Sequence, residues 1–330
     1  MFRKKQKWLR IVVISALCLI IWGGSMLACI AQEEYPTKSI HLYVPFGPGG
    51  ATDLAARALV SVIPAYLGQP VIVHNMPGAG GTICDQFVLK QKPDGYTMQM
   101  AAIAANLTVL AFNPDLPFSY NDFTLICRTQ ASPGVVAVAS DTPWDTLEEL
   151  LEYIRNNPGK ATHSSSGIGS MHHLGAWLLL KAAGIPIENV TLIPFDSGAE
   201  QVTAILGGHI DFAYINYIEV ISQIRAGKMK LLAVTPERLK EFPNVPTFKE
   251  LGYPGVNVIG WRGIVGPPGL SDYIVNKWVE AIEKVKQDRA WLKLIDRLGE
   301  VVWYQGPEEF AKSLVKEYEE AREIAKLAGR

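Results

Sequence analysis

Glycines and hydroxyl-bearing residues are concentrated in three turns of this sequence. The turns are residues 47–53 (GPGGATD), 164–170 (SSSGIGS) and 195–199 (FDSGA), and each precedes a segment with the apolar periodicity of a helix. Glycines let a backbone approach a ligand closely, and the free N–H groups of a first helical turn attract an anion. Together with neighbouring hydroxyl groups, these N–H groups can bind a carboxylate or phosphate without a charged side chain. Three such turns around one crevice would form a carboxylate site.

Each of these turns also has a purely structural interpretation. Residues 47–53 lack the Gly-Lys-Ser/Thr of a nucleotide-binding P-loop and the spacing of a dinucleotide-binding fingerprint, and they fit a tight turn equally well. A similar turn at 78–81 (GAGG) favours the structural interpretation. Ser170 fits a helix cap, and Asp196 would repel an anion unless its side chain points away.

Ser165 and Ser166 lie close in sequence to His172 and His173, which suggests a hydrolase. No GxSxG motif surrounds either serine, and adjacent histidines point in different directions on a helix. We therefore predict no catalytic residue and interpret both histidines as packing and capping residues. The sequence has no CxxC, HExxH or Cys/His cluster, so it indicates no metal site and no cofactor.

The first 31 residues have the layout of an export signal. Five basic residues and no acidic residue precede an apolar segment at 11–27. Residues 26–29 (MLAC) resemble a bacterial lipoprotein cleavage box, in which Cys29 becomes the lipidated first residue. Cleavage after Ala31 would instead release the protein, and an uncleaved segment is barely long enough to anchor it. We expect an exported protein, periplasmic or lipid-anchored at the outer face of the cytoplasmic membrane.

The composition is that of an ordinary folded protein. Of 330 residues, 48% are hydrophobic and 19% are charged, which suffices for a sizeable core in about two domains. Beyond the basic N-terminus the chain has 26 basic and 32 acidic residues, and this balance excludes nucleic acid as the main partner. Cys84 and Cys127 either pair in a disulfide or are buried as small hydrophobic residues, and burial is the commoner outcome.

Strands and helices are predicted to alternate, which is typical of an α/β fold with a parallel sheet. We expect strands at 40–45, 71–74, 96–101, 135–139, 190–195, 210–215, 231–235 and 256–265. We expect helices at 52–66, 82–90, 146–157, 171–183 and 197–207, then two amphipathic helices, the last from about residue 307. Ser197 and Glu200 have the spacing of a capping box, in which each side chain accepts a hydrogen bond from the other residue's backbone.

A series of short motifs occurs in a characteristic order between about residues 33 and 325. They are 35–40 (YPTKSI), 44–53 (VPFGPGGATD), 67–71 (LGQPV), 75–81 (NMPGAGG), 93–97 (PDGYT), 157–160 (NPGK), 207–211 (GGHID), 232–235 (LAVT), 245–247 (VPT) and 267–269 (PPG). In these motifs the sequence resembles the extracytoplasmic solute receptors of tripartite tricarboxylate transporters, also called Bug or TctC-like receptors.

The resemblance implies a two-domain periplasmic-binding-protein architecture of type II, the Venus flytrap, with mixed, mainly parallel sheets and a ligand cleft between the domains. Domain 1 would be discontinuous, with residues 32–130 and 256–330, and domain 2 would comprise residues 131–255, after a signal peptide at 1–31. Such a receptor is a monomer without enzymatic activity. It closes on a small organic acid by a hinge motion and delivers it to two membrane permease subunits.

Transferred motif by motif, the resemblance implies that loop backbones and hydroxyl groups hold the ligand. In domain 1 the ligand-binding residues would be Phe46, Gly49, Gly50, Ala51, Thr52, Asp53 and Asn106, helped by the rest of 102–106. In domain 2 they would be Ser165, Ser166, Gly167, Ser170, Asp196, Ser197 and Gly198, with Tyr214 and Asn216 at the end of a strand as further candidates. These are the same loops that the turn chemistry indicates.

One departure from the family pattern concerns charge. Many members carry a lysine or arginine followed by glycine after an aromatic residue, whereas residues 195–198 of this chain are FDSG. The missing positive charge argues against a tricarboxylate such as citrate. Arg262 would restore a bidentate carboxylate contact or, equally, form a surface ion pair.

Two other functions stay open at this point. An exported α/β hydrolase acting on a carboxylate substrate would turn its ligand over, and a sensor module would present the ligand to a signalling partner. The candidate ligands are dicarboxylates and tricarboxylates, aromatic acids and acidic amino acids.

Overall fold

A computed structural model describes residues 34–329 of the chain. The predicted signal peptide, with Cys29, lies outside these residues. The chain divides into the units Met1–Thr37 and Lys38–Arg330, and every helix and strand described below belongs to the second. None of the helices within 34–329 combines the length and the apolar character that crossing a membrane requires.

The largest sheet has six strands. In spatial order they are β11 (Val301–Gln305), β4 (Thr124–Ser132), β10 (Gly260–Gly266), β3 (Thr97–Ala102), β1 (Ile40–Val44) and β2 (Val71–Asn75). Strand β4 was not predicted, because Arg128, Thr129 and Gln130 interrupt its apolar run. All three of these polar side chains are nevertheless buried, since β4 lies inside the sheet.

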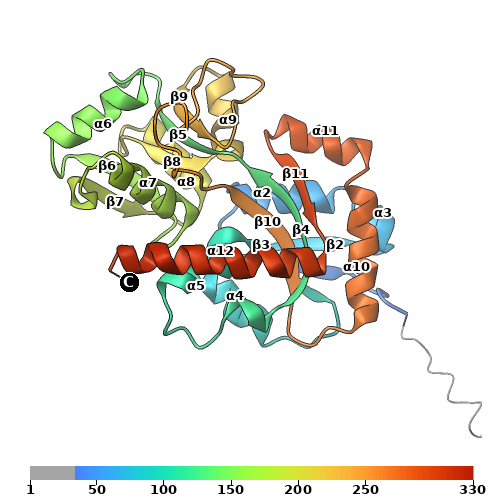
Figure 1. Cartoon of the computed structure of the whole chain (residues 1–330). Coiled ribbons are helices and arrows are strands. Elements are labelled where there is room, and N and C mark those ends of the chain that lie inside the picture. The colour runs from blue at the N-terminus through green and yellow to red at the C-terminus, as the bar shows by residue number, and fades with distance from the viewer. Residues whose placement is uncertain (1–33, 330) are drawn as a thin grey trace, which may run out of the picture. The chain divides into compact units, whose positions relative to one another are not determined.

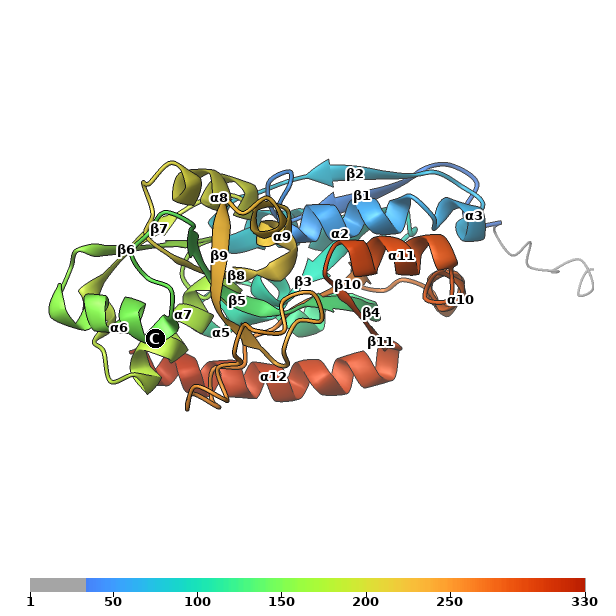
Figure 2. The same ribbon diagram turned by 90° about the horizontal axis from the view of Figure 1, so that it is seen from above.

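Helices cover both faces of this sheet. Helix α12 (Pro307–Leu327) and the short α5 (Val109–Phe112) lie on one face, and α2 (Ala51–Val60) lies on the other beside α11 (Arg289–Arg297) (Figures 1 and 2). The remaining helices around this sheet are α3 (Pro64–Leu67), α4 (Thr82–Leu89), α10 (Asp272–Val285) and the short turns η1 (Ala79–Gly81), η2 (Ala104–Thr108) and η3 (Tyr120–Asp122).

The chain between β4 and β10 builds two smaller sheets. One has the order β8 (Ala213–Asn216), β5 (Gly134–Ala139), β9 (Met229–Thr235), and the other pairs β6 (Ala161–Ser165) with β7 (Val190–Pro194). Their helices are α6 (Leu147–Asn156), α7 (Met171–Ala182), α8 (Gly198–Leu206), α9 (Tyr217–Arg225) and the short η4 (Ile187–Asn189). A single residue, Pro133, separates β4 from β5. The predicted domain limits at residues 131 and 255 stay a prediction.

The sheets are mixed, as predicted, but they are not mainly parallel. Strand β1 runs parallel to β2 and β3, and β6 runs parallel to β7. The five other pairings are antiparallel, because β10 and β4 run against their neighbours and β5 runs against both β8 and β9. The expectation of a mainly parallel sheet is wrong because alternation of strands and helices does not reveal strands such as β4.

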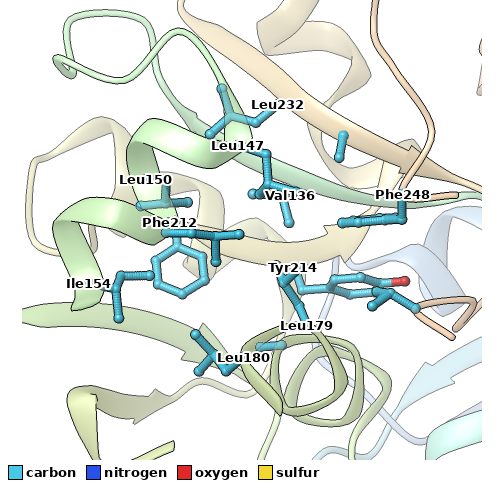
Figure 3. Close-up of a cluster of buried hydrophobic side chains, with 14 of the residues drawn as sticks. Val136, Leu147, Leu150, Ile154, Leu179, Leu180, Phe212, Tyr214, Leu232 and Phe248 are labelled. Carbon is cyan, nitrogen blue, oxygen red and sulfur yellow. The ribbon is translucent and has the colours of Figure 1, made fainter. Parts of the chain in front are cut away.

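Strand β5 is buried along its whole length because helices cover both faces of its sheet. On one face Val136 packs with Phe212, Tyr214 and side chains of α6 and α7, as Figure 3 shows. On the other face Val135 packs with side chains of α8 and α9. Burial of both faces explains why its sequence is continuously apolar rather than alternating.

Several predicted boundaries needed correction. The expected helix at 52–66 is two helices, α2 and α3, because Pro64 lacks the N–H that would continue the first. Three helices, rather than two, form the C-terminal part, since Asp288 caps the start of α11 by accepting hydrogen bonds from Ala290 and Trp291 at 2.7 and 3.1 Å. Cys84 and Cys127 are buried and free, so they do not form a disulfide.

Candidate functional site

A small cavity of about 40 Å³ lies where the N-termini of α2, α7 and α8 meet. The start of α9 and two strands of the large sheet, β3 and β10, complete its wall. The lining residues are Phe46, Gly50, Ala51, Thr52, Ala102, Ile103, Ala104, Ser166, Ser170, Met171, His172, Ser197, Gly198, Asn216, Glu219, Gly260, Trp261 and Arg262. The three glycine- and serine-rich turns of the sequence therefore meet at one pocket.

Asp53 holds the first turn in shape without lining the pocket. Its Oδ2 accepts hydrogen bonds from the Gly49 N–H and from Arg57, each at 2.9 Å, and its Oδ1 accepts one from Asn75 at 2.9 Å. Burial raises the pKa of Asp53, but the hydrogen bonds from Arg57, Gly49 and Asn75 outweigh it and lower the pKa. Gly49, at φ +75°, and Asp53 therefore shape the loop, whereas Gly50, Ala51 and Thr52 line the pocket.

The second turn is organised by two serines. Ser165 Oγ lies 2.9 Å from Ser170 Oγ and accepts a hydrogen bond from the Gly167 N–H at 3.1 Å. Ser170 Oγ accepts from the His173 N–H at 3.2 Å and caps α7. Ser166 and Ser170 face the pocket, while Ser165 and Gly167 hold the turn.

The third turn brings Ser197 and Gly198 to the pocket but not Asp196. Ser197 Oγ accepts from the Glu200 N–H at 3.3 Å, whereas Glu200 accepts from the Asp196 N–H and not from that of Ser197. Only half of the predicted capping box is therefore formed. The Asp196 side chain is exposed, and its carbonyl oxygen accepts a hydrogen bond from the Gly47 N–H at 3.0 Å, which joins the first and third turns.

Asn106 supports the wall of the pocket without lining it. Its Oδ1 accepts from the Ala102 N–H at 3.0 Å, and its Nδ2 donates to Asp85 at 3.2 Å. Gln99 donates to the same Asp85 oxygen at 2.6 Å. This buried network positions residues 102–104, which line the pocket.

Arg262 lines the pocket from the central strand β10 and forms an ion pair. Its Nη1 donates to Glu300 at 2.9 Å and to the Gly260 carbonyl at 2.7 Å. Glu300 also accepts from Gln130. The pair is buried, with side-chain exposures of 3% and 0%, so the expectation of a surface ion pair is wrong. The Nε of Arg262 has no hydrogen-bond partner among the described residues.

Tyr214 lies in the hydrophobic core and not at the pocket. It is fully buried, its ring stacks on Phe248 at 5.7 Å, and its hydroxyl donates to the Val258 carbonyl at 2.9 Å. Figure 3 shows the ring among core side chains. Asn216, two residues later, does line the pocket.

His172 and Glu219 are pocket residues that the sequence did not single out for binding. His172 Nε2 lies 3.3 Å from Glu219 Oε2, and the side chains are 6% and 3% exposed. Burial raises the pKa of Glu219, but His172, the Ala51 N–H and the Asn216 amide outweigh it and lower the pKa to about 2. Asn216 and Glu219 have the spacing of a capping box, which was the one sequence signal available for Glu219.

Features of this kind are typical of anion-binding sites. First-turn N–H groups have no partner within their own helix, and here three helix starts surround one cavity. The described residues contain no cluster of three or more His, Cys, Asp or Glu side chains that could hold a metal ion.

The sequence of the chain matches a family model and a curated relative along most of its length. The family model for the tripartite tricarboxylate transporter family receptor matches residues 55–329. A UPF0065 protein of Bordetella pertussis is 32% identical over 291 residues, which cover 88% of each chain.

Solved structures show the same fold. A protein described as a periplasmic transporter superposes with a TM-score of 0.85 at 33% identity, covering 89% of this chain and 98% of that one. MatC of Rhodopseudomonas palustris, solved with bound malate, has a TM-score of 0.83 at 26% identity, covering 88% of this chain and all of the other. The fold is thus the two-domain periplasmic-binding-protein fold of type II.

The matched family is a family of transporter receptors, and the solved neighbours include MatC with bound malate and the periplasmic binding protein BugD, which decides against the hydrolase alternative. The chain belongs to the tripartite tricarboxylate transporter receptor family.

Proposed function

We propose that this protein is the extracytoplasmic receptor of a tripartite tricarboxylate-type transporter and binds a small organic carboxylate in the pocket at the starts of α2, α7 and α8. The observation that carries this proposal is the convergence of three helix N-termini on one cavity that Arg262 also lines. Such a site holds a carboxylate through backbone N–H groups and hydroxyls. Malate in the related MatC is a ligand of this class.

In the proposed receptor, one group of residues contacts the ligand and a second group supports the first. Phe46, Gly50, Ala51, Thr52, Ser166, Ser170, Ser197, Gly198 and Arg262 line the pocket and would contact the ligand. Gly49, Asp53, Asn106, Ser165 and Gly167 would hold those residues in place.

The size of the cavity supports binding by hinge closure. A volume of about 40 Å³ has room for a water molecule or two but not for a dicarboxylate. The first and third turns are in direct contact through the hydrogen bond from Gly47 to Asp196. The ligand therefore enters an open form of the receptor. Its contacts with the first and third turns then shift the equilibrium between the open and closed forms towards the closed form.

We further propose export through the N-terminal signal, either with lipidation at Cys29 or with release, and delivery of the ligand by the monomeric receptor to two permease subunits. The signal pattern in residues 1–31 and the family support this assignment.

A thermal-shift screen of residues 33–330 against mono-, di- and tricarboxylates, aromatic acids and acidic amino acids tests the function. A ligand at about 100 times its Kd adds about 2.7 kcal/mol, or roughly 5 to 10 °C in Tm for a chain of this size. The bound acid should be recovered unchanged. Consumption of the acid would contradict the proposal, as would the absence of a shift with every class.

Substitution of Ser166 tests the location of the site. Ser166→Ala removes a pocket hydroxyl and should weaken binding about tenfold, since a hydrogen bond to a charged group contributes about 1.5 kcal/mol or more. Ser61→Ala is the matched control, because among residues 34–329 the exposed Ser61 hydroxyl, at the end of α2, is bonded only to the Ala58 carbonyl. Equal affinities of the two variants in calorimetric titrations would place the ligand elsewhere.

A further inference from the structure

The carboxylate of Glu219 lines the proposed carboxylate site, beside the starts of α2 and α8. Its Oε2 accepts hydrogen bonds from the backbone and side-chain amides of Asn216 at 3.2 and 3.0 Å and lies 3.3 Å from His172 Nε2. Its Oε1 accepts from the Ala51 N–H at 3.0 Å. The side chain is 3% exposed.

Capping of α9 accounts for only one of these two oxygens. The bonds to Asn216 use Oε2, as in an ordinary capping box. Oε1 instead reaches the first N–H of α2, which is 168 positions away in sequence. It also packs against the start of α8, where a Cβ on Gly198 would come within 1.9 Å of it. Glu219 thus places a fixed negative charge between two of the three helix starts.

The other charged groups at the pocket do not supply an excess of positive charge. Arg262 is the only lysine or arginine among the described lining residues, and Glu300 neutralises it at 2.9 Å. Asp53, behind the first turn, is neutralised by Arg57. His172 donates to or pairs with Glu219, and even its protonated form would only cancel the charge of Glu219.

We propose that Glu219 makes this receptor select carboxylates whose other end is an ammonium group over dicarboxylates of the same length. The inference rests on the proposed function, because it concerns the second end of the ligand in that site. A dicarboxylate brings two negative charges to a pocket whose side-chain charges sum to zero or less. An amino acid with its ammonium group at the far end has no net charge, and its ammonium N–H groups can donate to a buried carboxylate. A like charge that faces a competing ligand is a common means of excluding that ligand.

Matched ligand pairs test the proposal by titration calorimetry on the wild type, Glu219→Gln and Glu320→Gln. The pairs are succinate and 4-aminobutanoate, glutarate and 5-aminopentanoate, adipate and 6-aminohexanoate, and terephthalate and 4-(aminomethyl)benzoate. Each pair exchanges a carboxylate for an aminomethyl group on one skeleton. Glu320→Gln changes the net charge equally, but its side chain is 61% exposed on α12.

For the pairs that bind, we expect the wild type and Glu320→Gln to prefer the amino acid at least tenfold and Glu219→Gln to lose or reverse this preference. A wild-type preference for the dicarboxylates would overturn the proposal even if Glu219→Gln failed to fold. A preference for the amino acid that survives in Glu219→Gln would also overturn the proposal, because a group other than Glu219 would then cause the preference. Both results leave the carboxylate receptor intact. Failure of the wild type and of Glu219→Gln to bind any carboxylate, in this set or the wider screen, would instead refute the proposed function.

Discussion

Asp85 is a fully buried carboxyl group that supports the pocket wall through Gln99 and Asn106. Burial raises its pKa to about 7, against the lowering effect of these two hydrogen bonds. Between about pH 4 and pH 7 the folded state keeps a proton that the unfolded state releases. Stability from this group is therefore fully present below about pH 4 and falls as the pH rises to about 7.

Replacement of Asp85 by asparagine should remove this pH dependence. Asparagine Oδ1 can accept both existing hydrogen bonds, and its amide nitrogen would replace an oxygen that has no partner among the described residues. We expect Asp85→Asn to be more stable than the wild type at pH 8 by about 2 kcal/mol or more and nearly equal to it at pH 4.5. Urea unfolding at both pH values measures the difference.

The control for this prediction is Asp94→Asn, since Asp94 is an exposed turn residue that accepts a hydrogen bond from the Tyr96 N–H at 3.1 Å. It should show no comparable gain at pH 8. Equal destabilisation of Asp85→Asn at both pH values would mean that the carboxyl is ionised in the folded protein throughout this range.

Helix α12 is fixed to the sheet by a buried charge. Glu317 accepts hydrogen bonds from Arg128 on β4 and from the indole of the pocket residue Trp261, both at 2.8 Å. The guanidinium of Arg128 lies over the rings of Trp261 and Trp303, at 4.6 and 4.4 Å. Its side chain has no exposure, whereas Glu317 is 23% exposed. Removal of Glu317 would therefore leave an unpaired charge inside the fold.

We expect Glu317→Ala to lower the free energy of unfolding by about 3 kcal/mol, the lower end of the range for a broken buried pair. Glu317→Gln, which can keep an acceptor for the indole, should lose less. Glu320→Ala removes an exposed partner 3.9 Å from Lys316 and should change stability by less than about 1 kcal/mol. Urea unfolding would contradict the proposed anchor if Glu317→Ala and Glu320→Ala lost the same amount.

The first and third turns are in contact, and the cavity between them and their neighbours is too small for a dicarboxylate. A Cβ placed on Gly47 would lie 3.1 Å from the Cβ of Ser197, a few tenths of an ångström closer than in a disulfide. Gly47→Cys with Ser197→Cys should therefore cross-link the two turns under oxidation. Cys84 and Cys127 are buried and should not compete.

If ligand entry requires opening, the oxidised double variant should lose binding, and reduction should restore it to the level of the reduced protein. Calorimetric titration before and after reduction measures the effect, and each single cysteine variant is a control for loss of the Ser197 cap. Undiminished binding by the fully oxidised double variant would show that the site fills without separation of these turns.

Features that depend only on neighbours along the chain could be predicted from the sequence alone. The helix starts near residues 146, 170 and 197 were predicted because a cap needs only residues within one turn, and the structure shows the caps at Thr146, Ser170 and Ser197. The three glycine- and serine-rich turns were recognised for the same reason. The family resemblance, which rests on ordered local motifs, was confirmed by the family model.

Folding determines which residues of each turn face the pocket and which ones hold the turn in shape. Gly49, Asp53 and Asn106 belong to the right segments, yet their hydrogen bonds place them behind the wall. Strand β4 and its antiparallel pairings escaped prediction because buried Arg128 is tolerated only with partners distant in sequence. Glu219 shows the same limit, since its bond to Ala51 spans 168 positions and no local pattern encodes it. The net charge of the pocket depends on charged residues that only folding brings together, so it could not be worked out from the sequence alone.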